Sequence, residues 1–546
     1  MAYISDLHCH PSFKPYNSQG YRFKPDGSPY TIWDEVPEDK KSKSKITKRG
    51  IKKILNSMEK DSQTNLDLLV NNGFKSAFCV IHPIERGWFN INEKKLTIRF
   101  AECLYNFVSQ LNQIGAWFTG IPIQKIKSIR AELKGNQKLD YFEKETLQEY
   151  RFLVESEGVK GKDGEVFIIA TNYKHYQSII AQDDYIAGIL TIEGGHALNV
   201  LPKVKDFTKP YEQHTPAKQR DIRTGVLTNI ERIKGIGEHE DSFKKEHAPL
   251  FITLSHFYNN FLAGHARSYL GMIGKIFDQQ AAMYTGITSL GKEAIDKLLK
   301  RDAATGERRV LIDVKHMSLQ SRKEYYALVN GKDIPIIFSH GAVTGYSWSR
   351  FLGEDTNSDH ELGYFSHVSI NLYNEDIEAI VASDGLIGLS THEGRMPGGY
   401  AKKELKEVND RIRRNDRNLD KYLIQQRHLY IKLFMGNVFQ IVKTINNASA
   451  WDHICIGSDY DGIMDPFDRY KESDDFNVLF GDIFAFLNHP LDVQIYEDNV
   501  PLILEPDDIK KLMFGLKPRQ IVEKLSHLNI ERFLSNYFTD TYRLGN

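Results

Sequence analysis

Cysteine is scarce in this chain of 546 residues. The four cysteines, Cys9, Cys79, Cys103 and Cys455, are too few and too scattered for a disulfide framework, which excludes the small disulfide-stabilised class. No apolar run approaches the length of a membrane-spanning helix. The first strand-like run begins at Tyr3, which leaves no room for a signal peptide. We therefore expect a cytoplasmic protein in a reducing compartment.

The chain also lacks an excess of either charge. Its 71 Lys and Arg residues against 72 Asp and Glu residues give a formal net charge of -1. Such a balance creates no general field that would attract nucleic acid or an anionic membrane, so neither is expected as a partner. Hydrophobic residues make up 41%, which is enough for a sizeable core. These features favour a soluble enzyme that acts on a small molecule.

Short apolar runs bounded by turn residues recur along the chain and alternate with helical patterning. Runs of this kind are typical of strands buried on both faces, which belong to parallel sheets covered by helices. The alternation predicts an α/β fold, a TIM-like (β/α)8 barrel. The eight predicted strands are 3–8, 75–81, 186–193, 249–255, 309–315, 334–339, 385–391 and 453–458. A ninth run, VFIIATN at 166–172, has no ligand-type residue at its end and is interpreted as the lead-in to a helix.

Four stretches exceed what a barrel needs. We interpret residues 1–546 as a single barrel domain with long inserted loops and helices near 11–62, 120–165, 203–248 and 395–450. The stretch 411–434 is predicted to form a helix with polar and apolar faces. It would pack against the barrel or against a second subunit, so a homodimer stays open.

Residues that bind metals stand at the ends of several predicted strands. His8 and His10 alternate across one residue, so both face the same side of a strand and can share an ion. Glu193 precedes two glycines, and a carboxylate at such a turn can bridge two cations. His316 and His340 each end a strand. Either would alone indicate a hydrogen-bonded core histidine; together the set predicts two divalent ions, for which zinc fits best and manganese, iron or cobalt less well.

Two further residues have catalytic roles in this interpretation. Asp459 follows the last predicted strand, and an acid beside a metal-bound water can accept its proton and return it to a leaving group. Asp461 is the competing candidate, with hydrogen bonding in the loop as its alternative role. His256 follows the fourth predicted strand, where it would face the substrate and stabilise an oxyanion. Its alternative role is that of a third ligand on one metal.

Five motifs, in this order, resemble the membrane (renal) dipeptidase family of zinc peptidases, within the amidohydrolase superfamily. They are EGGH at 193–196, GITSLGKEAIDKLL followed by LIDVKHMS at 286–318, IFSHGA at 337–342, GSDYDG at 457–462 and LNIERFL at 528–534. The resemblance implies a TIM-like barrel with two zinc ions and cleavage of short peptides at a free carboxyl-terminal residue. It also implies metal roles for Glu193, His316 and His340, a substrate-facing role for His256 and the acid/base role for Asp459.

The chain departs from the family pattern in two functional positions. The family usually has His-x-Asp on the first strand, whereas this chain has His8-Cys9-His10, so one ligand loses a charge. The family arginine that holds the substrate carboxylate is missing from SHVSINLYNEDI at 366–377, and Arg350, upstream in the same loop, is the predicted replacement. The inserted segments could also build a different pocket.

The sequence thus predicts a metal-dependent hydrolase, a dipeptidase, in which a hydroxide shared by two metals attacks the scissile carbonyl while Asp459 transfers the proton. The expected substrate is a short peptide or small amide, bound through Arg350 and His256. One alternative is another amidohydrolase reaction, on an N-acyl amino acid, a lactone or an amide. A second alternative is a binding protein that has lost the chemistry.

Overall fold

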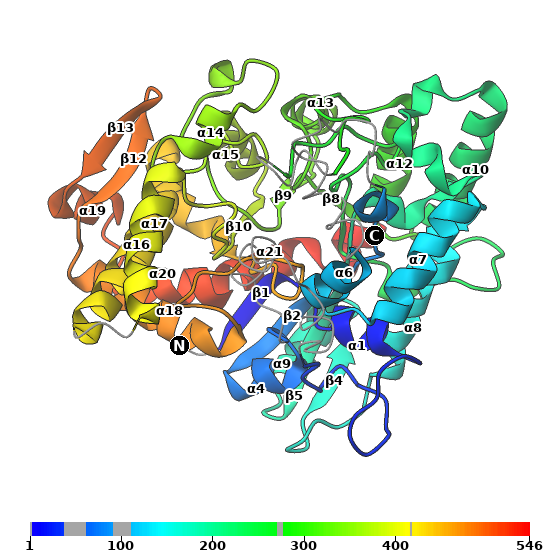
Figure 1. Ribbon diagram of the computed structural model, residues 1–546, viewed down its shortest axis with the longest axis horizontal. Coiled ribbons are helices and arrows are strands. Elements are labelled where there is room, and N and C mark those ends of the chain that lie inside the picture. The colour runs from blue at the N-terminus through cyan, green and yellow to red at the C-terminus, as the bar shows by residue number, and fades with distance from the viewer. Residues whose placement is uncertain (1–2, 38–61, 91–110, 270–276, 415–417, 546) are drawn as a thin grey trace.

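Eight parallel strands form the centre of the molecule and confirm the predicted (β/α)8 barrel (Figure 1). The computed structural model describes residues 3–37, 62–90, 111–269, 277–414 and 418–545. The barrel strands follow one another in sequence order around the sheet. They are β1 (Ile4–Cys9), β2 (Phe74–Ile81), β5 (Tyr185–Glu193), β7 (Phe251–Thr253), β8 (Leu311–Asp313), β9 (Ile337–Phe338), β10 (Leu386–Leu389) and β11 (Ile454–Ile456).

Backbone contacts between the first and last strands close the barrel. Cys9 forms a parallel bridge with Tyr460 just beyond β11. The Asp459 N–H donates to the carbonyl of His8 at 2.9 Å, and the His10 N–H donates to the carbonyl of Tyr460 at 3.0 Å. The carboxyl ends of all eight strands therefore meet at one mouth, where residues from distant parts of the chain converge.

The run 166–172 leads into helix α9 (Tyr173–Ile180) and is not one of the eight barrel strands, as interpreted from the sequence, but its first half is itself a strand. Residues Val166–Ile169 form strand β4, which pairs in parallel with the first half of β5 and precedes α9. The reason is the length of β5, which pairs with β7 only at Ile192 and Glu193. Its earlier residues present an open edge, and β4 supplies the hydrogen-bond partners that such an edge requires.

Helices cover the outside of the barrel, as the alternating pattern predicts. Among them α4 packs on β2, α9 on β5, α12 on β8 and α15 on β10. The α-helices of the described residues are α1 (Phe13–Ser18), α4 (Leu66–Asn71), α6 (Leu111–Thr119), α7 (Ile123–Gly135), α8 (Leu147–Glu155), α9 (Tyr173–Ile180), α10 (Pro216–Ile233), α12 (Ser289–Leu299), α13 (Leu319–Val329), α14 (Asn357–Glu361), α15 (Asn374–Ala382), α16 (Gly399–Arg413), α17 (Leu419–Ile445), α18 (Phe476–Asn488), α19 (Pro506–Leu512), α20 (Pro518–Glu523), α21 (Asn529–Tyr537) and α22 (Asp540–Leu544).

The additions to the barrel gather at two flanks. Figure 1 shows α7, α8 and α10 on one side, and α16, α17 and the hairpin of β12 (Val493–Glu497) and β13 (Val500–Leu504) on the other. A second small pair, β3 (Leu139–Asp140) and β6 (Val200–Leu201), is antiparallel. The helix predicted at 411–434 is divided between the end of α16 and the start of α17, and these helices pack on each other. Residues 38–61 of the 11–62 addition lie outside the described residues.

Three of the four cysteines lie within the described residues. Cys9, Cys79 and Cys455 are buried free thiols, and Cys103 lies outside the described residues. Within the described ranges, no helix combines the length and the apolar character that crossing a bilayer requires.

Candidate metal centre

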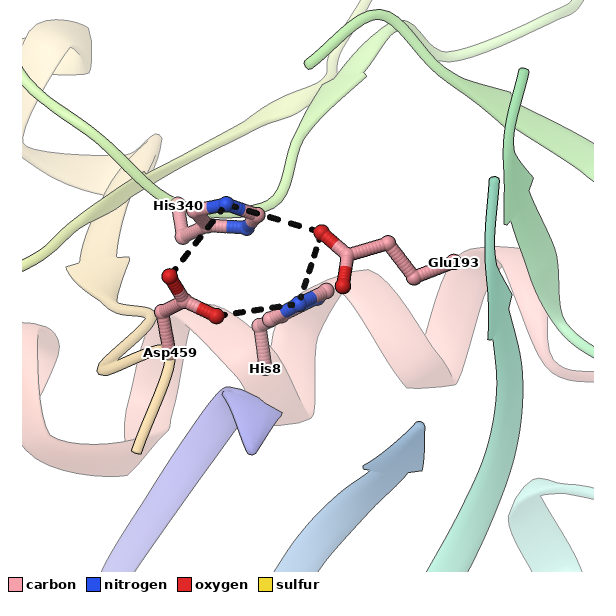
Figure 2. A group of neighbouring side chains, drawn as sticks. All are labelled: His8, Glu193, His340 and Asp459. Atoms are coloured by element: carbon pink, nitrogen blue, oxygen red, sulfur yellow. Dashed lines mark ion pairs between the residues drawn. The ribbon is translucent and has the colours of Figure 1, made fainter. Parts of the chain in front are cut away.

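The five predicted metal ligands lie together around the carboxylate of Glu193. Its Oε1 is 3.5 Å from His8 Nε2, 3.3 Å from His316 Nε2 and 3.8 Å from His340 Nε2. Its Oε2 is 3.4 Å from His10 Nε2. Figure 2 shows His8, Glu193 and His340 pointing toward one another beyond the strand ends. Glu193 thus stands between histidines on both of its oxygens, as a bridging ligand would.

His82 is a member of this group that the sequence analysis missed. It follows β2 directly, and its Nδ1 lies 3.3 Å from Glu193 Oε2. The His82 ring is 5.6 Å from the His10 ring and 4.8 Å from the His256 ring, between centroids. We refer to His8, His10, His82, Glu193, His256, His316, His340 and Asp459 as the Glu193 cluster. All eight side chains lie at the carboxyl ends of the strands, at the mouth of the barrel.

Asp459 is the more exposed of the two carboxylates in the Glu193 cluster. Its Oδ1 lies 3.4 Å from His10 Nε2 and 3.9 Å from His8 Nε2, and its Oδ2 lies 3.9 Å from His340 Nε2 (Figure 2). Its side chain is 13% exposed, against 3% for Glu193. An acid at the open side of the cluster can exchange a proton with an entering substrate, whereas the bridging position of Glu193 is closed.

Asp461 faces away from the cluster. Its carboxylate pairs with buried Lys14 at 2.6 Å and accepts the backbone N–H groups of Gln63 and Thr64. These contacts join the loop after β11 to the segment before α4. The structure therefore gives Asp461 the loop-binding role that was the alternative to catalysis.

The backbone at the mouth adopts conformations that bring the ligands inward. Gly194, with φ of +92°, and Gly195 follow Glu193, and a Cβ on Gly195 would lie 2.6 Å from the carbonyl oxygen of Leu254. Only glycine permits this approach, which sets Glu193 against the β7 end. His316 and Asp459 have φ values of +65° and +62°. Such left-handed conformations cost free energy in non-glycine residues and concentrate at functional sites.

Two buried aspartates fix the strand ends beneath the cluster. Asp313 accepts hydrogen bonds from Thr253 Oγ1 and Ser339 Oγ, both at 2.6 Å, which joins the ends of β7, β8 and β9. Asp6 accepts the N–H groups of His8 at 3.1 Å and Ser458 at 2.9 Å. The residues next to His340 and Asp459 are thereby held by side chains one layer below them.

His256 is oriented by a carboxylate from another strand end. Glu85 Oε2 accepts His256 Nδ1 at 2.6 Å, and the same carboxylate accepts the N–H groups of Phe257 and Tyr258. This contact leaves His256 Nε2 facing Glu193 Oε1 at 3.5 Å. Burial opposes the charged form of His256, but Glu85 and Glu193 outweigh it and raise its pKa. The position suits either a substrate-facing donor or a further ligand, so both roles stay open.

The cluster fits divalent metal ions. The Nε2 atoms of His8, His10 and His316 and the Nδ1 of His82 are buried and have no hydrogen-bond partner among the described residues. Two ligand atoms, each about 2.1 Å from a tetrahedral zinc, lie about 3.4 Å apart. The distances from Glu193 oxygens to nitrogens of His10, His82 and His316 are 3.3 to 3.4 Å, which matches the separation of two ligands on one zinc ion.

The protonation of three of the histidines also suits metal ligation. Burial lowers the pKa values of His82, His316 and His340 well below the ordinary value. They are therefore neutral, and neutral imidazole is the form that binds metals. Three neutral ligands near a shared carboxylate are a donor set typical of zinc and related ions.

Arg350 does not lie among the side chains of the Glu193 cluster. It ends the exposed turn Trp348–Arg350, and its guanidinium lies over the ring of Tyr346 at 5.6 Å from the centroid. None of the ion pairs within the described ranges involves Arg350. Its role in binding a substrate carboxylate stays a prediction.

Comparison with known proteins gives matches in structure only. No protein-family model matches the chain, and no curated protein sequence matches it. The metallopeptidase called dipeptidase AC aligns with a TM-score of 0.44 and 11% identity over 98% of both chains. A metallopeptidase from Rhodobacter sphaeroides, liganded with a phosphinate mimic of L-Ala-D-Ala, aligns with a TM-score of 0.45 and 10% identity over 98% of this chain and 99% of the other.

The probable dipeptidase PvdM from Pseudomonas aeruginosa aligns with a TM-score of 0.40 and 14% identity, over 87% of this chain and 88% of the other. With TM-scores below 0.5, these alignments carry no argument about the function of this chain. The site in this chain is therefore argued from its own residues.

Proposed function

We propose that this chain is a metal-dependent hydrolase, a dipeptidase that binds two divalent ions in the Glu193 cluster, with zinc as the best fit. The observation that carries the proposal is the convergence of six histidines and two carboxylates at one mouth of a parallel barrel. A buried group of this kind without hydrogen bonds would be costly in a protein that did not bind a cation there.

The ligands divide between the two oxygens of Glu193. His316 and His340 face Oε1, whereas His10 and His82 face Oε2. His8 lies near Oε1 and near Asp459. This division supports two ions that share one carboxylate. Bound divalent ions at such a site polarise a carbonyl and lower the pKa of water.

The protein's own groups act on the proton and the substrate. Asp459, at the open side, accepts a proton from the attacking water and returns it to the leaving amine. His256, held through Nδ1 by Glu85, directs Nε2 toward the position where the carbonyl oxygen of the substrate would develop charge. The buried surroundings of His256 keep bulk water away from its ring.

A metal-replete substrate screen tests the proposal. Purified protein is loaded with zinc and with manganese, its metal content is measured by elemental analysis, and dipeptides, N-acyl amino acids and lactones are offered in parallel. We expect two metal equivalents per chain and hydrolysis of dipeptides. Turnover of N-acyl amino acids or lactones alone would replace the dipeptidase activity by another hydrolase reaction. Protein that binds no metal would exclude the hydrolase.

A further inference from the structure

Lys315 is a buried hydrogen-bond donor beside the Glu193 cluster. It precedes His316, its side chain is fully buried, and its Nζ has no hydrogen-bond partner among the described residues. The Nζ lies over the ring of Phe338, 5.2 Å from the centroid. A Cβ on Gly341, the residue after His340, would lie 3.0 Å from Lys315 Nζ. A buried amino group without an acceptor is unfavourable unless a ligand supplies one.

Arg395 is a cation at the same mouth. It lies in the loop that follows β10, where Asn371 holds its backbone carbonyl at 2.8 Å. Its Nη1 donates to the carbonyl of Ser268 at 2.9 Å, and no ion pair within the described ranges involves it. The guanidinium of Arg395 is therefore free to bind an acid that enters the mouth.

Tyr269 adds a neutral donor to this pair. Its hydroxyl is buried and has no hydrogen-bond partner among the described residues. Its ring lies 5.3 Å from that of Phe257, which in turn lies 5.1 Å from His316. Tyr269 follows Ser268, the residue that holds Arg395. The segment passes alongside the cluster, because the N–H of Ala266 donates to the carbonyl of His316 at 2.8 Å.

We infer that Lys315, Arg395 and Tyr269 form a subsite for the free carboxylate of a short peptide, next to the Glu193 cluster. The inference rests on the proposed function and names the part of the substrate that this hydrolase recognises. All three groups are hydrogen-bond donors, while the nearby carboxylates of Glu193 and Asp459 face histidines instead. An incoming carboxylate would accept hydrogen bonds from these donors.

Binding measurements test the subsite without turnover. N-acetylalanine and N-acetylalanine amide are titrated calorimetrically into metal-loaded protein, because they differ only in the carboxylate. The wild type should bind the acid roughly 10- to 100-fold more tightly, as expected for charge-assisted hydrogen bonds. Arg395→Met should remove most of this preference, Arg395→Lys should restore part of it, and Tyr269→Phe should weaken it less. Metal content is measured for every variant, so that loss of the centre is recognised.

Variants of two other arginines are compared with Arg395→Met in the same binding measurement. Arg519→Met, on the exposed face of α20 with a side chain 77% exposed, should leave the acid preference unchanged. Arg350→Met should also leave it unchanged, whereas the prediction from sequence requires its loss. The inference is overturned if the preference persists in Arg395→Met with both metals retained, because the metals themselves would then hold the carboxylate. It is equally overturned if Arg350→Met abolishes the preference.

Kinetics separate the subsite from the proposed function. Alanyl-alanine and its carboxyl-terminal amide contain the same scissile bond, and Lys315→Met or Arg395→Met should raise the Michaelis constant for the first substrate only. If the wild type cleaves both equally and binds both acetyl compounds equally, the hydrolase stands and the subsite is refuted. If the wild type cleaves neither but binds N-acetylalanine through Arg395, the subsite stands and the dipeptidase is refuted.

Discussion

Replacing Glu85 by Gln is expected to slow turnover while both metal ions stay bound. Glu85 is buried and holds His256 Nδ1 at 2.6 Å, so that His256 Nε2 faces the Glu193 cluster. The same carboxylate accepts the N–H groups of Phe257 and Tyr258 at 3.3 and 3.2 Å through different oxygens. Glutamine keeps the volume but has one carbonyl oxygen and no charge, so it cannot replace all three contacts.

The size of the effect follows from the bond that is lost. A hydrogen bond to a charged group contributes about 1.5 to 3 kcal/mol. If His256 meets the carbonyl oxygen of the substrate, this orientation acts mainly in the transition state. The free energy then converts to a decrease of roughly 10- to 100-fold in kcat, at about 1.4 kcal/mol for each factor of ten.

Steady-state kinetics with elemental analysis of Glu85→Gln measures this effect. A matched control is Glu231→Gln, because Glu231 on α10 places its Oε2 3.2 Å from Nε2 of His239 in the loop after α10, and both side chains are partly exposed. This control should match the wild type. Loss of one metal equivalent in Glu85→Gln would refute the reasoning and make His256 a metal ligand. Unchanged kcat, Michaelis constant and metal content would remove the Glu85–His256 pair from the mechanism.

Three further changes test other parts of the molecule. Glu193→Gln should lose metal and activity together, because an amide supplies no charged bridge; elemental analysis of the variant checks this. Asp459→Asn should keep its metal and lose turnover by roughly 100-fold or more. Asp461→Asn, which breaks the contact with Lys14, should instead lower the melting temperature, and the reverse ranking in turnover would reassign the base. Burial raises the pKa of Asp355 from 3.8 to about 6, so the folded carboxyl keeps a proton that the unfolded one has released. The free energy of unfolding should therefore fall as the pH rises from about 4 to 6, by roughly 3 kcal/mol from this group. Urea titrations should show that Asp355→Asn lacks this part of the slope, and an unchanged slope would contradict the assignment.

The barrel and most of its ligands could be predicted because both leave local signals. A strand buried on both faces must be apolar along its length, and a ligand at the mouth must follow such a run directly. His316 and His340 satisfy both conditions. His82 carries the same signal after the run at 75–81, so the rule that selects the other histidines applies to it equally. Strand β4 resembles the barrel strands in composition, and only the length of β5 explains its place.

The contacts between loops left no such signal. Glu85 and His256 lie 171 positions apart, and Arg395 and Ser268 lie 127 positions apart. Which arginine reaches the mouth depends on how several loops fold over one another, and neither composition nor spacing encodes that arrangement. The sequence alone therefore does not distinguish Arg350 from Arg395 as the arginine at the mouth of the barrel.

The closure of the barrel by its first and last strands has a consequence for its biosynthesis. The hydrogen bond from Ser458 to Asp6 joins residues 452 positions apart, and His8 meets Asp459 at the same seam. On the ribosome, His8-Cys9-His10 therefore emerges long before the last barrel strand. A flexible nascent segment would select ions by intrinsic affinity, which favours copper over zinc. Because the complete site exists only after the last strand docks, the proposed function requires the folded cavity to select the ion, with metal loading as the final step of maturation.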